Sequence, residues 1–280
     1  MTDPGWDLAA LDRAAAAGDG EAAHRLALLS GVGLNTPHDP LLAMTRLRQA
    51  AGLGHDLATR TLAVLDAEPG GLEAWFRPSS PRTVSERPHV LIADQLISPA
   101  VCDWLRARAE PRLAPAEIYD AATGSGRADP VRTNTVTVVD LAGSDLVLVL
   151  LRERIARLAG LPVSGLEPSQ VLRYQPGQAF DRHVDFLDPA VPGHRDDLAR
   201  RGQRIATCLV WLNDDYEGGE TAFEARDQRF RGRKGDAILW ANVTPNGAPD
   251  PLSRHAGLPP TRGEKWVLSQ WMRPFAPRRM

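Results

Sequence analysis

The chain is poor in cysteine, in net charge and in long apolar runs. Its 280 residues include only two cysteines, Cys102 and Cys208, and both lie in apolar stretches. A disulfide framework is therefore not predicted, and both side chains are expected to be buried thiols in a reducing compartment. The formal net charge of -2 predicts no strong attraction to nucleic acid or to an anionic membrane surface.

No apolar run approaches membrane-spanning length, and the N-terminus has neither the basic start nor the apolar core of a signal peptide. We therefore expect a soluble, cytoplasmic protein that binds neither membranes nor nucleic acids. A length of 280 residues is sufficient for one domain of ordinary size and a smaller one.

Residues 8–67 are rich in alanine and leucine and poor in β-branched residues, which favours helices. Ala14, Gly18 and Ala22 recur at positions 50, 54 and 58, a shift of 36 residues. A period of this length is typical of helix-turn-helix repeats, which present a concave face to a protein partner. The same pattern also suits helices that merely cap a second domain, and fewer than three full units are visible.

Residues 69–88 are rich in Pro, Gly, Ser and Arg, and we predict a linker there. The predicted parts are thus a helical segment at 1–68, the linker, and a second domain at 89–280. In this domain, helices are expected after Ser98 and at roughly 145–158. Short apolar runs with turn signals then follow, as in a β-sandwich or jelly roll, and residues 205–212 are the predicted central strand.

The chemically informative stretch contains His183 and Asp185. Side chains two residues apart on a strand project to the same face, so these two are expected to point the same way. His255, shortly before another apolar strand, can supply a third ligand. Two imidazoles and one carboxylate on one face of a metal leave the opposite positions open, as in non-haem Fe(II) oxygenases. Lys265, ten residues further on, is a candidate anchor for a dicarboxylate.

The tripeptide around His183 and Asp185 is by itself a weak signal, because a His near an Asp is more often a surface pair. His194 has Pro, Gly, Arg and Asp neighbours and is expected to be a solvated loop histidine. The remaining histidines lie outside the predicted barrel strands and receive no role; they are His24, His38, His55 and His89.

An ordered series of motifs surrounds the candidate ligands. Its members are Arg173-Tyr174-Gln175-Pro176-Gly177, Gly218-Gly219-Glu220-Thr221, Lys234-Gly235-Asp236-Ala237, His255-Ala256-Gly257 and Lys265-Trp266. Over residues 90–274 the series resembles the catalytic domain of prolyl 4-hydroxylases, which are Fe(II)- and 2-oxoglutarate-dependent dioxygenases. The N-terminal segment resembles tetratricopeptide-like repeats of the Sel type. The resemblance implies an α+β fold, with an α-helical repeat segment followed by a double-stranded β-helix (jelly-roll or cupin-like) domain and supporting helices.

The resemblance also implies roles for individual residues. The metal ligands would be His183, Asp185 and His255, the 2-oxoglutarate-binding residues would be Lys265, Tyr174 and Thr207, and the substrate contacts would be Arg132 and Trp271. No catalytic side chain beyond the metal ligands is implied. The segment before Arg132, at 121–127, is either a lid over a peptide substrate or an ordinary hairpin, and Trp271 is equally compatible with simple core packing.

The implied reaction hydroxylates a prolyl residue of a protein or peptide. Fe(II), 2-oxoglutarate and O2 are the implied cofactors and co-substrates, succinate and CO2 are formed, and ascorbate is a candidate reductant. Asp185 favours hydroxylation, because related halogenases lack this carboxylate. Two alternatives stay open: hydroxylation of another amino-acid side chain or a small molecule, and a non-catalytic adaptor that binds a partner through its helical repeats.

Overall fold

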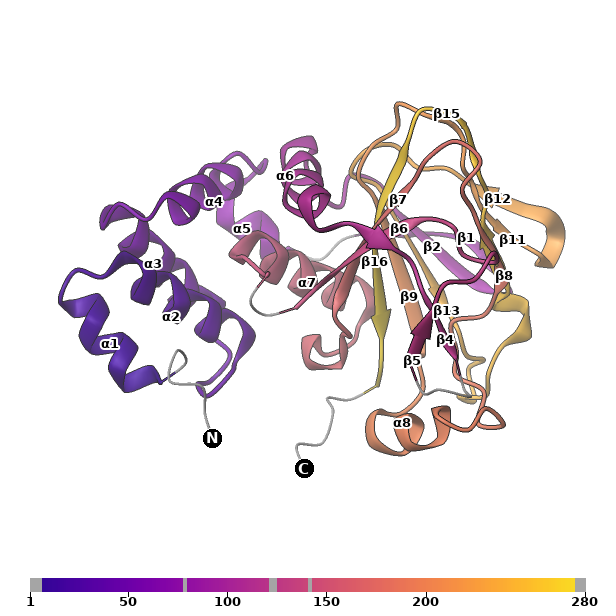
Figure 1. Ribbon diagram of the computed structural model, residues 1–280, viewed down its shortest axis with the longest axis horizontal. Helices are drawn as coiled ribbons and strands as arrows, with labels where there is room; N and C mark the ends of the chain where they lie inside the picture. Colours follow the sequence, from indigo (N-terminus) through magenta and orange to yellow (C-terminus); the bar gives the residue numbers. More distant parts are fainter. Residues whose placement is uncertain (1–6, 78–79, 121–124, 141–142, 275–280) are drawn as a thin grey trace. The chain divides into compact units, whose positions relative to one another are not determined.

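The structure is a computed structural model that describes residues 7–77, 80–120, 125–140 and 143–274. The chain divides into two compact units. The first unit comprises Met1–Arg77 and Leu141–Arg154, and the second comprises Pro78–Asp140 and Ile155–Met280. Figure 1 labels most of the helices and strands of both units.

The first unit is helical. Its helices are α1 (Leu8–Ala16), α2 (Gly20–Val32), α3 (Pro40–Gly52), α4 (Asp56–Asp66), α5 (Gly71–Phe76) and the first part of α7 (Leu146–Ala159). The N-cap residues of α2 and α4 are also 36 positions apart. The Asp19 side chain caps α2, and the equivalent residue of the next pair, His55, caps α4 through the backbone N–H of Ala58. Their assignment to Sel-type repeats stays a prediction.

The first part of α7 packs on the helices of this unit. A Cβ added at Gly31 on α2 would lie 3.0 Å from Leu146 and 3.1 Å from Val149. Farther along α7, the buried Arg154 lies over the Trp75 ring and forms an ion pair with Glu68. The helix predicted at 145–158 therefore exists, but its residues 146–154 belong to the helical unit.

The second unit is built on two antiparallel sheets. The larger has the strand order β1 (Arg82–Glu86), β2 (His89–Ala93), β13 (Ala237–Ala241), β9 (Ala206–Trp211), β16 (Lys265–Met272), β7 (Ser169–Tyr174), β6 (Thr135–Val139) and β3 (Ala114–Pro115). The smaller has the order β12 (Gln228–Phe230), β11 (Thr221–Phe223), β14 (His255–Gly257) and β8 (Phe180–His183). As predicted, β9 is a central strand and is buried along its whole length.

Further elements surround these sheets. They are the strand pairs β10 (Glu217–Gly218) with β15 (Pro260–Arg262) and β4 (Ile118–Asp120) with β5 (Ser125–Arg127), and the helices α6 (Pro99–Ala109) and α8 (His194–Arg201). Ser98 caps α6, as the sequence predicted. Among the described residues, the helices are all too short or too polar to cross a bilayer.

One apolar core joins the two sheets. Trp211 and Trp240 of the larger sheet and Phe223 of the smaller one belong to the same cluster, and each is at most 1% exposed. The Phe223 and Trp240 rings meet edge to face at 5.4 Å. Aromatic burial on this scale is a large part of what stabilises such a sandwich. The predicted α+β fold, with helices first and antiparallel sheets after them, is confirmed.

Two local predictions differ from the structure. The predicted linker, 69–88, contains α5 and β1, because β2 offers an edge with which β1 can pair. Residues 188–203 contain α8, so His194 begins a helix and does not lie in a loop. For the segment 121–127, predicted to be either a lid or an ordinary hairpin, residues 121–124 lie outside the described residues, and Ser125–Arg127 pairs antiparallel with β4. The choice between the two stays a prediction.

Candidate metal centre

One pocket of the second unit is lined by every site residue that the sequence predicted. These residues are Arg132, Tyr174, His183, Asp185, Thr207, His255, Lys265 and Trp271. The lining also includes residues that the sequence reasoning did not single out, among them Gln170, Phe180 and Trp240. The structure therefore gathers the eight candidates in one place.

Strand pairing brings the three candidate ligands together. His183 on β8 and His255 on β14 are cross-strand neighbours, and their ring centroids lie 4.3 Å apart. Asp185 lies between them, with Oδ1 at 3.6 Å from His183 Nε2 and Oδ2 at 3.7 Å from His255 Nε2. The expectation that His183 and Asp185 share one strand is wrong: β8 ends at His183, and a bend turns Asp185 back toward both imidazoles.

The backbone fixes the tautomer of both imidazoles. Nδ1 of His183 lies 2.7 Å from the carbonyl oxygen of Asp181, and Nδ1 of His255 lies 2.9 Å from that of Ser253. A carbonyl oxygen only accepts hydrogen bonds, so each Nδ1 carries the proton. In this tautomer the lone pair is on Nε2, on the side of Asp185, which is the arrangement that metal-binding histidines require.

The charges of the site also suit a divalent cation. Burial and the nearby His255 lower the pKa of His183, so its imidazole is neutral near pH 7. Burial alone would raise the pKa of Asp185, but His255, His183 and the Thr207 hydroxyl together lower it. A neutral His183 imidazole and an ionised Asp185 carboxylate are thus available to a metal, as metal binding demands. Together with His255 they can hold an ion.

Two consecutive side-chain hydrogen bonds lead from Asn242 through Thr207 to Asp185. Thr207 Oγ1 donates to Asp185 Oδ2 at 2.7 Å, and Asn242 Nδ2 donates to Thr207 Oγ1 at 2.8 Å. The sequence reasoning missed Asn242, because it lies just after β13 and outside every motif that was singled out. Its contact with Thr207 on β9 becomes visible only in the folded structure.

Lys265 and Tyr174 also line the pocket. They are cross-strand neighbours on β16 and β7, and Nζ of Lys265 lies 5.2 Å from the centroid of the Tyr174 ring. Lys265 is 1% exposed, and its burial lowers its pKa to about 8. Burial likewise raises the pKa of Tyr174 to about 12, so its hydroxyl keeps its proton. A buried ammonium is a suitable partner for a carboxylate.

Arg132 and Trp271 are both held by neighbours. The Arg132 guanidinium lies 4.7 Å from the centroid of the Phe180 ring and donates to Gln170 at 3.3 Å. The Trp271 ring is covered by the guanidinium of Arg204 at 3.6 Å, and Arg204 donates two hydrogen bonds to Glu167. These contacts restrain the Arg132 guanidinium and the Trp271 indole in the pocket lining.

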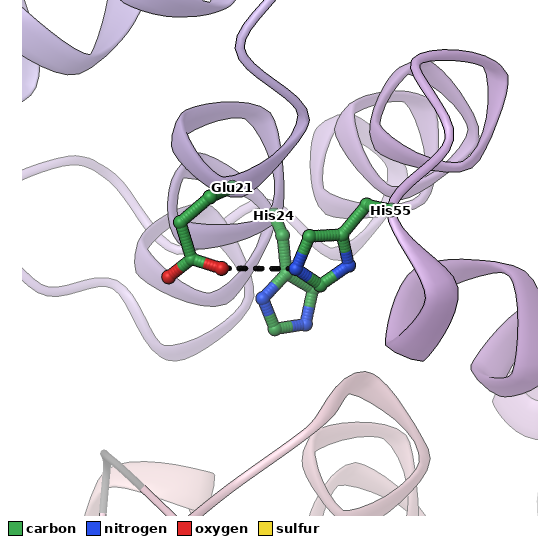
Figure 2. A group of neighbouring side chains, drawn as sticks. All are labelled: Glu21, His24 and His55. Atoms are coloured by element: carbon green, nitrogen blue, oxygen red, sulfur yellow. Dashed lines mark hydrogen bonds and ion pairs between the residues drawn. The ribbon is translucent and has the colours of Figure 1, made fainter.

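A second His and Glu cluster lies in the helical unit (Figure 2). The rings of His24 on α2 and His55 at the start of α4 are stacked, with centroids 4.4 Å apart, and His55 Nε2 lies 2.9 Å from Glu21. Nδ1 of His55 accepts from the backbone N–H of Ala58, so the proton of the neutral ring is on Nε2 and is donated to Glu21. This tautomer offers no lone pair to a metal, and the contact instead ties α4 to α2.

Comparison with known proteins agrees with this geometry. Residues 169–273 match the model of the 2OG-Fe(II) oxygenase superfamily. Prolyl 4-hydroxylase 1 of Arabidopsis thaliana is 34% identical, over 69% of this chain and 71% of that protein. The chain belongs to the prolyl 4-hydroxylase-like 2OG-Fe(II) oxygenases. Probable prolyl 4-hydroxylase 4 of the same plant is 32% identical, over 71% of this chain and 72% of that protein.

Solved structures place the fold in the same family. The viral collagen prolyl hydroxylase of Paramecium Bursaria Chlorella virus-1, in its 2OG complex, has a TM-score of 0.51 and 26% identity, over 68% of this chain and 98% of that one. A prolyl hydroxylase from Trichoplax adhaerens, with a TM-score of 0.50 and 14% identity over 66% and 83% of the chains, shares the fold. Membership of these oxygenases identifies the chain as a 2-oxoglutarate-dependent dioxygenase that uses Fe(II) and O2.

Proposed function

We propose that this dioxygenase hydroxylates a prolyl residue of a protein or peptide, with iron held by His183, Asp185 and His255. The observation that carries the metal assignment is the pair of Nδ1–H to carbonyl hydrogen bonds, which leave the Nε2 atoms of both rings facing one buried carboxylate. The same donor set, two imidazoles and a carboxylate, is typical of non-haem Fe(II) oxygenases.

In this proposal Lys265 and Tyr174 hold the co-substrate. Lys265 Nζ is the buried cation of the pocket that can pair with the distal carboxylate of 2-oxoglutarate. A charge-assisted hydrogen bond of this kind is worth on the order of 1.5 to 3 kcal/mol. When iron, 2-oxoglutarate and O2 are bound, oxidative decarboxylation of the co-substrate supplies the oxidant and leaves succinate and CO2.

Prolyl residues are proposed as the target because the relatives that cover most of the domain are named prolyl 4-hydroxylases. The pocket supports this choice, since the indole of Trp271 gives a prolyl ring an apolar face and Arg132 can donate to a peptide carbonyl. Arg132 and Trp271 are the substrate-contacting residues in this proposal.

The test supplies the purified chain with Fe(II), 2-oxoglutarate and ascorbate, together with a library of proline-containing peptides. We expect succinate release that depends on peptide, and a mass gain of one oxygen atom on a prolyl residue. Matched peptides with Ala in place of Pro should release only background succinate. Oxygen on another side chain, or succinate that no peptide increases, would contradict prolyl hydroxylation and favour another side chain or a small-molecule substrate.

Several sequence predictions outside the catalytic site extend this proposal. Both cysteines, Cys102 and Cys208, are buried thiols, which suits the cytoplasmic location that we propose. Three further statements remain predictions. They are a protein partner for the helices of residues 8–67, domain boundaries at residues 68 and 88, and ascorbate as the reductant.

A further inference from the structure

Asn242 is a fully buried polar side chain beside the candidate metal centre. Its backbone is fixed on both sides, since its N–H donates to the Ile205 carbonyl and its carbonyl accepts from the Asp250 N–H, each at 2.9 Å. Its side chain begins a row of two hydrogen bonds that runs through Thr207 to Asp185. The three side chains of this row are 0%, 1% and 4% exposed, respectively, so water has little access to it.

The direction of these hydrogen bonds follows from the groups involved. An ionised Asp185 can only accept, so the single proton of the Thr207 hydroxyl points to Asp185 Oδ2. The Thr207 oxygen must then accept from its other neighbour, and the amide of Asn242 supplies that N–H. Asn242, whose backbone is anchored, therefore donates to Thr207, and Thr207 donates to the Asp185 carboxylate.

We propose that Asn242 and Thr207 are positioning residues that restrain the Asp185 carboxylate for metal binding, and that Thr207 is not a ligand of 2-oxoglutarate. The inference rests on the proposed metal centre and departs from the role that the family resemblance implies for Thr207. Both carboxylates of 2-oxoglutarate only accept hydrogen bonds at neutral pH. The one proton of Thr207 cannot serve Asp185 and a co-substrate carboxylate together.

The first test is a titration of the apo full-length chain with Mn(II), without 2-oxoglutarate. Thr207→Val removes the hydroxyl and keeps the branched shape, and Asn242→Ala removes the donor behind it. Loss of a group that orients a metal ligand commonly weakens metal binding by about 10- to 100-fold, and we expect roughly tenfold for each variant. The double variant should bind no more weakly than Thr207→Val, because Asn242 acts through the hydroxyl.

The second test separates the metal from the co-substrate. At saturating Mn(II), Thr207→Val should bind 2-oxoglutarate as tightly as the wild type, whereas Lys265→Ala should bind it far more weakly. Weaker 2-oxoglutarate binding by Thr207→Val, with unchanged Mn(II) affinity, would overturn the proposal and restore Thr207 as a co-substrate ligand. Additive losses in the double variant would also overturn it, since they indicate independent structural effects.

Two further variants guard the interpretation. Asn246→Ala alters an exposed asparagine in the turn after the same strand and should leave Mn(II) affinity unchanged. If Asn242→Ala does not fold, the isosteric Asn242→Asp replaces the donor by an acceptor that competes for the Thr207 proton, and Mn(II) affinity should again fall. Unchanged affinity in a folded Asn242→Asp would overturn the proposal. A wild-type chain that binds no Mn(II) would overturn the metal centre itself.

Discussion

At the scale of single residues, one backbone carbonyl sets the proton on each imidazole of the pocket. Asp181 and Ser253 accept from Nδ1 of His183 and His255, and a hydrogen bond of this kind contributes about 1 kcal/mol. His55 shows the opposite case, because a backbone N–H takes the lone pair of its Nδ1. The same residue type is therefore suited to a metal in one place and to a helix cap in the other.

Removing either imidazole should abolish turnover. We expect His183→Ala and His255→Ala to lose at least about 100-fold in activity, because loss of a ligand should cost more than loss of the groups that orient it. Peptide-dependent succinate release measures the effect, and circular dichroism verifies the fold. His194→Ala, outside the pocket lining, is the matched control and should keep wild-type activity. Wild-type rates in both pocket variants would refute the ligand assignment.

Binding of 2-oxoglutarate should weaken above about pH 8. Burial lowers the pKa of Lys265 to about 8, so the free enzyme holds a charged anchor below that pH and a neutral one above it. We expect the Kd of 2-oxoglutarate to rise by about tenfold per pH unit above the pKa, as one proton becomes linked to binding.

Lys265→Arg separates this effect from other titrations. A guanidinium stays charged in this range, so the variant should bind 2-oxoglutarate less well near pH 7, because of its different shape, but without the rise above pH 8. Isothermal titration between pH 7 and 9.5 would measure both proteins. The same pH profile in the wild type and in Lys265→Arg would exclude Lys265 as its origin.

At the scale of strands and turns, the register decides which predicted residues meet. The sequence was sufficient to select His183, His255, Lys265 and Tyr174, because their types and order are distinctive. It could not show that His255 lies opposite His183 or that Lys265 lies opposite Tyr174, since those pairings join segments far apart in the chain. Asn242 was missed for the same reason: its function depends on a neighbouring strand, and no local pattern marks it.

The turn that precedes β13 depends on a glycine. Gly235 has φ +94°, and a Cβ there would lie 2.2 Å from the carbonyl oxygen of Ile97. We expect Gly235→Ala to lower the free energy of unfolding by about 2 to 4 kcal/mol, through backbone strain and the clash together. Thermal or urea unfolding would measure it.

Gly177→Ala is the matched control for this prediction. Gly177 also has a positive φ, +83°, but a Cβ there would meet no atom within 4 Å. Its substitution should cost only the backbone term, about 1 to 2 kcal/mol. If both variants lose the same free energy of unfolding, the clash with the Ile97 carbonyl does not contribute to the destabilisation.

At the scale of the whole molecule, α7 links the two units through continuity of the chain. Leu146 and Val149 pack near Gly31, and Arg154 pairs with Glu68, so residues 146–154 complete the helical unit. The sequence predicted both the early helices and this later one but assigned them to separate parts. Nothing in local composition reveals that a helix far along the chain supplies the apolar surface on which the early helices close.

Deleting residues 1–77 should therefore destabilise the remaining chain. The deletion exposes Leu146 and Val149, and exposure of two large aliphatic side chains costs about 3 to 6 kcal/mol. We expect a Tm lower by roughly 10 °C and increased aggregation, measured by thermal scanning and light scattering. Adding Leu146→Gln and Val149→Gln to the deletion should reduce aggregation. A truncated chain as stable and soluble as the full one would contradict this account.

The most direct test of the central claim is an anaerobic titration of the full chain with Fe(II) and 2-oxoglutarate, followed by visible absorbance. A site made by His183, Asp185, His255 and Lys265 predicts a charge-transfer absorbance that needs both additions and saturates at one iron and one 2-oxoglutarate per chain. His183→Ala should show none. A wild-type chain without this absorbance, or the same absorbance in His183→Ala, would contradict the proposed centre.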